Sequence, residues 1–484
     1  FTITGNNPFR GWWTMGYRTY YSYQTGNWEN SNTWTSDPSG TSQLGNTVPG
    51  VNDIVVILTG RTITLTSDVS SPNIDLTINE GGFLNMASFS FTSGLQALRG
   101  QGTLQLASAS FPSAPTNTFV NAGGGTTEYM ANIVLPAAQL FYNNLKVNTS
   151  GVVTQMTNIS LNGNLEVAQG TFRINDDVAS QRRQLLINGN VLVAAGGSVT
   201  VGKGATNTTQ IPTGIATTTA PPFIDYYDAQ SHRVVILGDF INNGTVRFTN
   251  LPNPVYDLFP NTTADATTGF ATVYFRGNTN NTLSCNGITD FYNLVVDKGS
   301  DQSFSLTINS SEYNYFRIFG ANIAGGETAG FSATPSNPNL KKALWIRTGT
   351  MILEGSLAIP SLTEGNNPAS PALNYIIPAN AALKINGTEV IVQTTADKYE
   401  EVNAAYNLSG GLGIVNGVIE GPDESGLLVL GRLEVNNGYL STKESRGLLY
   451  NSDFSGQIVI NGGIVDAKQF RSLTPGTGKI SYMQ

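Results

Sequence analysis

The stretch LLINGNVLVAAGGSVTVG, residues 185–202, decides the fold expected for this chain. It contains three short runs of alternating apolar residues, separated only by Asn-Gly-Asn or by a pair of glycines. Alternation with a period of two predicts β-strands that each bury one face. The separators are too short for the long return connections of a β-sandwich. The stretch therefore favours strands that follow one another around the corners of a coil.

Similar phrases recur along the chain, and such recurrence is the signature of a solenoid, in which each unit buries its apolar face on a neighbour. We therefore predict an all-β fold, a right-handed parallel β-helix (β-solenoid) with an N-terminal aromatic-rich cap. Its coils would contain about 20 to 25 residues and stack about 4.8 Å apart, with Gly and Asn at corners because both tolerate positive φ. Further copies are LTINEGGFLNM (76–86), ISLNGNLEVAQGTFRI (159–174), LKINGTEVIV (383–392) and IVINGGIVDAKQF (458–470).

An Asn-Gly pair between alternating strands is also the strongest short signal for an antiparallel hairpin. Hairpins at Asn188-Gly189 and Asn461-Gly462 would make the chain a series of β-sandwiches, a stalk without a binding role. The two alternatives differ in strand direction, which a structure reveals directly.

The pattern divides the chain into a cap segment at 1–50 and a parallel β-helix at 51–484, which we expect to continue into further chain. Segments rich in Pro, Thr, Ser or Asn interrupt the alternation and are predicted to be loop insertions. They lie near 204–232, 251–268, 330–340 and 361–371.

Composition limits the classes of function. Charged residues are 12% of the 484, and the formal net charge is −8. Nucleic acid is not an expected partner, because phosphate binding needs a basic stripe that this sequence lacks. No apolar run is long enough to predict a transmembrane segment. The polar, uncharged surface is typical of a secreted bacterial protein, and the single cysteine, Cys285, is expected to pack inside a strand.

We assign no residue a catalytic, cofactor-binding or metal-binding role. His232 is the single histidine, which argues against a multi-histidine metal site and favours a surface or loop-packing role. Acidic pairs lie in predicted turns, where Asp is common, and a structural Ca²⁺ there is an alternative. The enzyme alternative, a polysaccharide lyase or hydrolase, would use these acids with Arg182 or Arg183. The pairs are Asp176 with Asp177, Asp225 with Asp228, and Asp423 with Glu424.

The first insertion contains PPFIDYYDAQSH (221–232), the best candidate for a ligand-contact loop. Insertions in solenoids tend to line one face, often the binding face. The candidate contacts are Asp225, Tyr226, Tyr227 and Asp228.

Tryptophan is concentrated ahead of the first regular strand. The open end of a solenoid exposes apolar side chains and unpaired backbone groups, so it needs a cap. We interpret these aromatics as that cap, with a sugar-binding platform as the alternative. They are Trp12, Trp13, Trp28 and Trp34.

Two longer segments resemble one another. Phe141-Tyr142-Asn143 in the first corresponds to Phe291-Tyr292-Asn293 in the second. We interpret the phenylalanine of each as core and the asparagine as a stacked corner.

The segment GNWENSNTWTSD (26–37), followed by PGVNDIVVI (49–57), resembles the opening of large cell-surface adhesins of Bacteroidota. The shared phrase is a Trp pair followed by Pro-Gly-x-x-Asp-x-Val-x-Ile. Here it consists of Trp28, Trp34, Pro49, Gly50, Asp53, Val55 and Ile57.

The resemblance implies an extracellular protein on the cell surface, exported across the outer membrane by the type IX secretion system, with gliding-motility adhesins as the best-known members. It implies a non-enzymatic adhesin or structural stalk. The implied partners are the secretion machinery, other cell-surface proteins, and glycans or abiotic surfaces.

Overall fold

The computed structural model describes residues 17–204, 231–250, 269–318, 344–359, 375–393, 427–442, 448–450, 456–467, 470–472 and 479–482. Apart from one short 3₁₀ helix, η1 (Ser31–Thr33), the regular elements of these residues are β-strands. The expectation of an all-β fold is confirmed. The chain forms two compact units, Phe1–Leu106 with Ser110–Phe119, and Ala107–Ala109 with Val120–Gln484.

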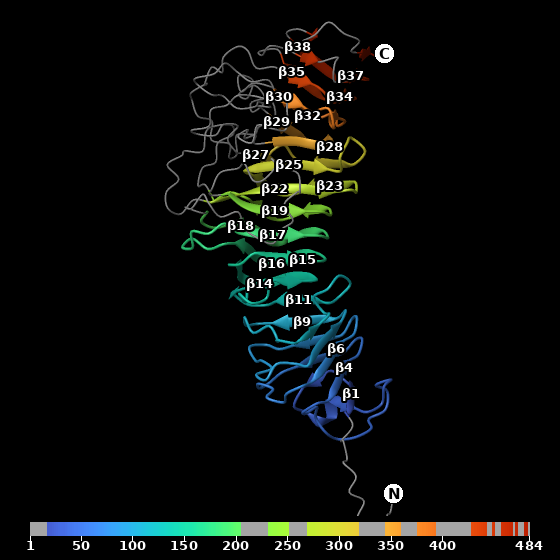
Figure 1. Ribbon diagram of the computed structural model, residues 1–484, viewed down its shortest axis with the longest axis vertical. Coiled ribbons are helices and arrows are strands. Elements are labelled where there is room, and N and C mark those ends of the chain that lie inside the picture. The colour runs from blue at the N-terminus through green and yellow to red at the C-terminus, as the bar shows by residue number, and fades with distance from the viewer. Residues whose placement is uncertain are drawn as a thin grey trace, which may run out of the picture. The chain divides into compact units, whose positions relative to one another are not determined.

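The first unit contains two sheets (Figure 1). One has the order β10-β8-β6-β4-β1-β3 and is parallel except between β1 and β3. The other joins β2, β5, β7 and β9 in parallel. The strands are β1 (Thr19–Ser22), β2 (Gly26–Asn27), β3 (Trp34–Thr35), β4 (Ile54–Ile57), β5 (Thr62–Thr64), β6 (Asp75–Ile78), β7 (Phe83–Asn85), β8 (Ala97–Gly100), β9 (Thr103–Leu106) and β10 (Thr116–Asn117).

Pairing partners in the first unit lie about one coil apart along the chain. Val55 pairs with Leu76, 21 residues ahead, and Leu76 pairs with Leu98, 22 residues ahead. All three side chains are 0% exposed. The alternation read from the sequence therefore produces an inward column of stacked aliphatic side chains.

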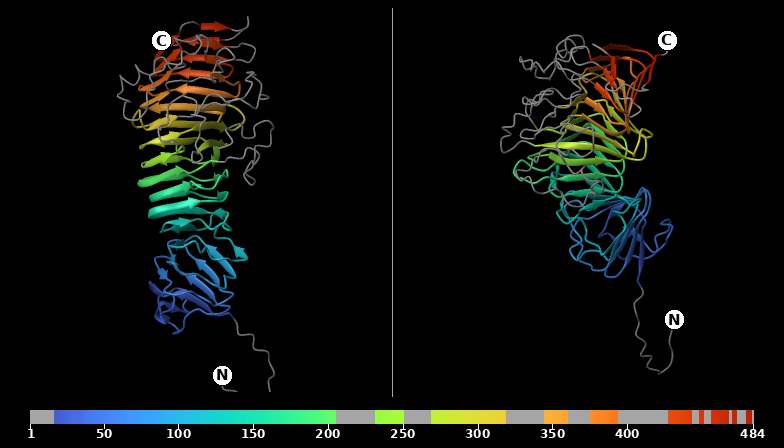
Figure 2. Two further views of the ribbon diagram at one scale, coloured as in Figure 1. Left: turned by 90° about the vertical axis from the view of Figure 1, so that its left-hand side faces the viewer. Right: turned by 45° about the horizontal axis from the view of Figure 1, so that its top comes forward.

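The second unit stacks parallel strands into longer ladders (Figure 2). The ladder on one side runs β11-β14-β16-β18 and continues through β20, β23, β26, β28, β31, β34 and β37 to β40. A second ladder runs β13-β15-β17-β19-β22-β25-β28. Shorter ones are β29-β32-β35-β38 and β30-β33-β36-β39. Every pairing between the named strands of this unit is parallel, as expected for a β-solenoid, and an isolated antiparallel bridge joins Thr249 to Phe270.

The strands of the second unit up to residue 298 are β11 (Thr126–Tyr129), β12 (Ile133–Val134), β13 (Phe141–Tyr142), β14 (Asn144–Gln155), β15 (Ile159–Leu161), β16 (Leu165–Ile174), β17 (Gln184–Ile187), β18 (Val191–Val201), β19 (Ser231–Ile236), β20 (Phe240–Asn242), β21 (Thr245–Arg247), β22 (Phe270–Gly277), β23 (Asn281–Cys285), β24 (Thr289–Phe291) and β25 (Asn293–Lys298). Those that follow are β26 (Ser305–Ser310), β27 (Phe316–Ile318), β28 (Leu344–Gly355), β29 (Leu357–Ile359), β30 (Tyr375–Ile377), β31 (Ala381–Ile385), β32 (Val390–Gln393), β33 (Leu427–Val429), β34 (Arg432–Val435), β35 (Tyr439–Thr442), β36 (Leu448–Tyr450), β37 (Gln457–Ile460), β38 (Ile464–Ala467), β39 (Phe470–Ser472) and β40 (Lys479–Tyr482).

The hairpin alternative fails at both tested places. The strands β17 and β18 flank Asn188-Gly189, and each pairs in parallel with strands of neighbouring coils. The same holds for β37 and β38 around Asn461-Gly462. Asn-Gly is therefore a corner between two strands of one coil.

Glycine occupies the corner because neighbouring coils approach closely. We expected Asn and Gly at corners because both tolerate a positive φ. Neither Asn188 nor Gly189 has a positive φ, so this expectation is wrong at this corner. A Cβ on Gly189 would lie 2.7 Å from the carbonyl of Gly163 in the preceding coil. Likewise, a Cβ on Gly238 in the next coil would lie 2.4 Å from the Gly189 oxygen.

Asparagine at the corners connects successive coils through its side chain. The Asn164 backbone N–H donates to Asn144 Oδ1 at 2.9 Å, and the Asn190 N–H donates to Asn164 Oδ1 at 2.7 Å. The Asp239 N–H donates to Asn190 Oδ1 at 2.8 Å, and the Thr282 N–H donates to Asp239 Oδ1 at 2.9 Å. This asparagine ladder satisfies backbone donors at the corners where the strands begin.

The two Phe-Tyr-Asn segments bury the tyrosine alike but differ in whether the phenylalanine enters the core. Phe291 is 0% exposed, as predicted, but Phe141 is 57% exposed, so its predicted core position is wrong. In β13 the inward residue is Tyr142, whose hydroxyl lies 3.2 Å from that of Tyr129. Because strand side chains alternate, Phe141 must then face outward. Cys285 is fully buried at the end of β23, which confirms its predicted packing inside a strand.

The predicted boundary at residue 50 falls inside the first unit, because β1 pairs in parallel with β4. The predicted insertions at 251–268, 330–340 and 361–371 lie outside the described residues. Most of the insertion at 204–232 also lies outside the described residues. Its last two residues, Ser231 and His232, begin β19.

Candidate functional site

A tyrosine-rich segment, YRTYYSY (17–23), begins the described part of the first unit. Because side chains alternate along β1, Tyr20 and Ser22 are buried while Tyr21 is only partly so. Parallel pairing of β1 with β4 brings the residues before β4 beside the beginning of β1. Residues 46–53 and the Tyr17–Tyr20 segment therefore line a common surface.

The two described cap tryptophans pack against each other. Trp28 is 2% and Trp34 1% exposed, and their ring centroids lie 5.0 Å apart in an edge-to-face arrangement. Trp34 Nε1 donates to the Trp28 carbonyl at 2.7 Å, and Phe91 lies 5.3 Å from Trp28. Neither ring offers the open face on which a sugar stacks. Trp12 and Trp13 lie outside the described residues.

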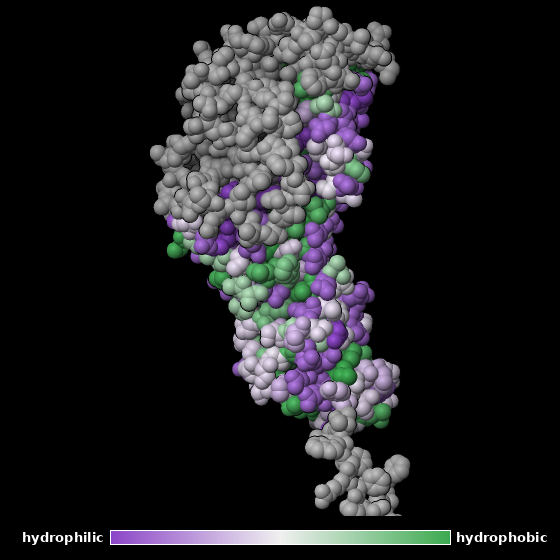
Figure 3. All heavy atoms as spheres, in the orientation of Figure 1, coloured by the Kyte–Doolittle hydropathy of each residue, from purple (hydrophilic) through white to green (hydrophobic). Residues whose placement is uncertain are grey.

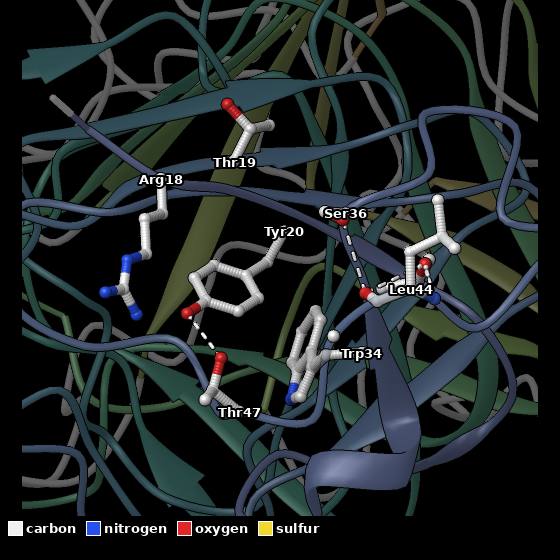
Figure 4. A pocket seen from close by; sticks show the side chains of 9 residues that line it. Arg18, Thr19, Tyr20, Trp34, Ser36, Leu44 and Thr47 are labelled. Atoms are coloured by element: carbon white, nitrogen blue, oxygen red, sulfur yellow. Dashed lines mark hydrogen bonds between the residues drawn. The ribbon is translucent and has the colours of Figure 1, made fainter. Parts of the chain in front are cut away.

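A cavity of about 240 Å³ lies beside these aromatics (Figure 4). Trp34, Tyr20 and Leu44 contribute its apolar wall. The Tyr20 hydroxyl is hydrogen-bonded to Thr47 Oγ1 at 2.8 Å, and Ser36 Oγ donates to the Leu44 carbonyl at 3.3 Å. The hydroxyl groups of Tyr20 and Ser36 in the wall are thus held in place by hydrogen bonds to neighbouring residues of the first unit.

A larger groove of about 680 Å³ adjoins this cavity, because the two share Arg18, Tyr20 and Thr47. Tyr17, at its edge, is 73% exposed, and Val51 is 55% exposed. The other residues that line it are Ser31, Asn46, Val48, Gly50, Asn52 and Asp53.

Charge in the groove comes from Arg18 and Asp53. The neighbouring Tyr20 hydroxyl raises the pKa of the Arg18 guanidinium above its ordinary value, so it remains cationic. Asp53 is 8% exposed, and its Oδ2 accepts the Gly50 N–H at 2.6 Å. The Pro-Gly-x-x-Asp phrase is therefore a turn closed by its own carboxylate.

The acidic pair Asp176 and Asp177 makes local contacts within and beside its own turn. Asp176 Oδ1 accepts the backbone N–H groups of Val178 at 3.0 Å and Ala179 at 2.7 Å. Asp177 forms an ion pair with Arg173. Asp423, Glu424 and the whole predicted contact loop, Asp225, Tyr226, Tyr227 and Asp228, lie outside the described residues.

His232 is fully buried, which rules out the predicted surface role and leaves the packing role that was its alternative. Nδ1 accepts the Arg183 backbone N–H at 3.0 Å, and Nε2 lies 2.9 Å from the Lys203 carbonyl oxygen. These contacts select the neutral tautomer with hydrogen on Nε2. Burial, together with the nearby cations Arg183 and Arg182, lowers the pKa of His232 to about 3. A ring bonded to backbone on both sides packs two coils together.

An arginine and aromatic cluster on β19, β22, β25 and β28 was not found from the sequence. Asp297, 9% exposed, accepts from Arg276 Nε at 2.8 Å and Arg347 Nη1 at 3.2 Å. The Arg276 and Arg233 guanidinium carbons lie 4.7 Å and 5.2 Å from the Tyr274 ring centroid. These residues are far apart in the sequence and meet only through the register of the coils.

The groove at Tyr17 and Arg18 was missed as well, although the run of tyrosines at 17–23 was a visible signal. Across the described ranges, no group of three or more His, Cys, Asp or Glu side chains is placed to hold a metal ion. No helix among those residues is long and apolar enough to cross a membrane.

Comparison with protein families, curated proteins and solved structures found no match for this chain.

Proposed function

We propose that this chain is a non-enzymatic adhesive or structural section of an exported cell-surface protein, built as a right-handed parallel β-helix. Parallel strands joined by a crossover have right-handed connections in about 98% of cases, which supports the handedness. The resemblance of the Trp28, Trp34 and Asp53 phrase to Bacteroidota adhesins supports the location, the type IX export route and a role in gliding or attachment.

The proposal is carried by polar side chains that connect neighbouring coils or close turns. Asn144, Asn164 and Asn190 bond coil to coil, Asp176 closes a turn, and His232 joins backbone groups of two segments. Residues that an enzyme would expose to a substrate are thereby engaged in the scaffold. On the face shown in Figure 3, hydrophilic and hydrophobic areas are intermixed over the described residues. Such a mosaic suits many weak contacts acting together.

Attachment is tested with the purified chain coupled to beads. We expect the beads to adhere to glass and to polysaccharide-coated surfaces more strongly than beads carrying albumin. Adhesion no greater than that of albumin beads would argue against the adhesive role. Antibody labelling of intact cells tests the location, and labelling that requires permeabilised cells would contradict it.

The enzyme alternative predicts a different outcome in solution. Acidic polysaccharides incubated with the chain, with and without Ca²⁺, would be shortened, and Asp176→Asn with Asp177→Asn would abolish the effect. Because Asp176 is engaged in its turn, we expect no shortening.

A further inference from the structure

Tyr17 is an unusual side chain for this protein. Among the described aromatic side chains only Tyr17, at 73%, and Phe141, at 57%, are largely exposed. Aromatic rings are normally buried because they contribute much apolar area to a core. Tyr17 instead stands at the edge of the 680 Å³ groove, a volume within the range of about 300–1,000 Å³ common for small-ligand sites.

The exposed charged group in this groove is the Arg18 guanidinium, and the buried Asp53 carboxylate offsets part of its charge. Arg18 is exposed, and among the described residues no carboxylate forms an ion pair with it. Asp53, the only other charged residue that lines the groove, is largely buried and accepts from the Gly50 N–H. A guanidinium in this position pairs best with a planar carboxylate, which it can bind through two N–H groups.

We propose that this groove binds an acidic saccharide, with Arg18 on the sugar carboxylate and the Tyr17 ring against a face of the sugar. Sugar C–H groups carry partial positive charge and pack on the negative face of an aromatic ring. The Asn46 amide carries donors and an acceptor, and the Asn52 amide, whose Oδ1 accepts from Asn73, adds donors that match sugar hydroxyls. This proposal rests on the proposed adhesive function, because it names the class of glycan that the adhesive protein would bind.

The groove wall is preformed. Asn52 has a φ of 60°, and its Oδ1 accepts from Asn73 Nδ2 at 2.9 Å. The Asp53 to Gly50 bond and the Tyr20 to Thr47 bond fix the two ends of the same loop. A site that is ordered before binding loses less conformational entropy when the ligand arrives.

The test is calorimetric titration of the whole chain with trigalacturonate, with cellotriose as the neutral analogue and poly-L-glutamate as an acidic polymer without sugar rings. We expect trigalacturonate to bind most tightly and less tightly at higher salt. Tyr17→Ala and Arg18→Met should each weaken binding by about tenfold or more, the equivalent of about 1.4 kcal/mol. Phe141→Ala, which removes an exposed ring elsewhere, should leave binding unchanged. Equal melting temperatures would show that the variants are folded.

Three results would overturn the assignment. They are failure to bind trigalacturonate, cellotriose binding as tight as that of trigalacturonate, and poly-L-glutamate binding that matches trigalacturonate and is unaffected by Tyr17→Ala. Bead adhesion separates this site from the general function. If wild-type beads adhere but the chain does not bind trigalacturonate, the saccharide site is refuted and the adhesive role is retained.

Discussion

Gly189 stacks directly on Gly163 of the preceding coil, and its N–H donates to the Gly163 carbonyl at 2.9 Å. A side chain at residue 189 would collide with that carbonyl, since a Cβ would lie 2.7 Å from it. This contact, between residues 26 positions apart in the sequence, explains why Asn-Gly recurs where strands turn.

Gly189→Ala should destabilise the second unit by about 1–3 kcal/mol, because the backbone of two coils must shift to admit the methyl group. Gly196→Ala is the matched control in the same coil, where a Cβ would be 3.8 Å from its nearest neighbour. Urea unfolding followed by circular dichroism measures both. Equal effects of the two substitutions would contradict the role of close approach.

Trp34→Ala should cost about 3–5 kcal/mol, the range for removing a large buried aromatic side chain. Trp34→Phe should lower stability less, because it keeps an aromatic ring in the core. Its remaining cost comes from the lost Nε1 hydrogen bond to the Trp28 carbonyl. Thermal unfolding measures both variants. A fully stable Trp34→Ala protein would show that the cap interpretation of these rings is wrong.

His232 should make stability sensitive to mild acid. Its pKa is about 3 in the folded chain and about 6.5 when unfolded. Between these values the unfolded state binds a proton that the folded state does not, so stability falls as pH falls below about 6.5. From pH 6.5 to 4.5 the loss from this group is about 2–3 kcal/mol.

His232→Asn is the variant that tests this, because Asn can still accept the Arg183 N–H but does not titrate. It should be less stable than wild type at pH 7, where it lacks the bond to the Lys203 carbonyl. Its stability should also fall less between pH 6.5 and 4.5. Identical pH dependence of the two proteins in urea unfolding would refute the assignment.

Asp297→Asn should cost about 3 kcal/mol or more, because it leaves the buried guanidinium groups of Arg276 and Arg347 without their shared carboxylate. Asp177→Asn is the control. Its carboxylate is 56% exposed, and exposed ion pairs contribute about 0–1 kcal/mol. A comparison of urea midpoints distinguishes the buried pair from the exposed one.

Cys285 should resist modification in the folded chain. Burial raises the pKa of its thiol to about 12, and only the thiolate reacts readily. Iodoacetamide at pH 8 should label the protein only after urea unfolding, and rapid labelling of the native chain would show that β23 opens.

Period-two alternation in segments such as 185–202 determined the β-strands and their inward faces, because burial of every second side chain follows from strand geometry alone. Although Asn-Gly is locally a hairpin signal, the recurrence of short strands without long return connections favoured the parallel coil. Residues whose environment is local were therefore predictable, including the inward Cys285 and the turn at Asp176.

Tertiary structure decided whatever depends on the register between coils. Phe141 and Phe291 occupy similar phrases, yet they lie in strands of different ladders, β13 and β24, and only Phe291 enters the core. The meeting of Arg276, Asp297 and Arg347 and the burial of His232 also need three-dimensional stacking. So does the groove beside Tyr17, since residues 46–53 reach it only through the pairing of β1 with β4.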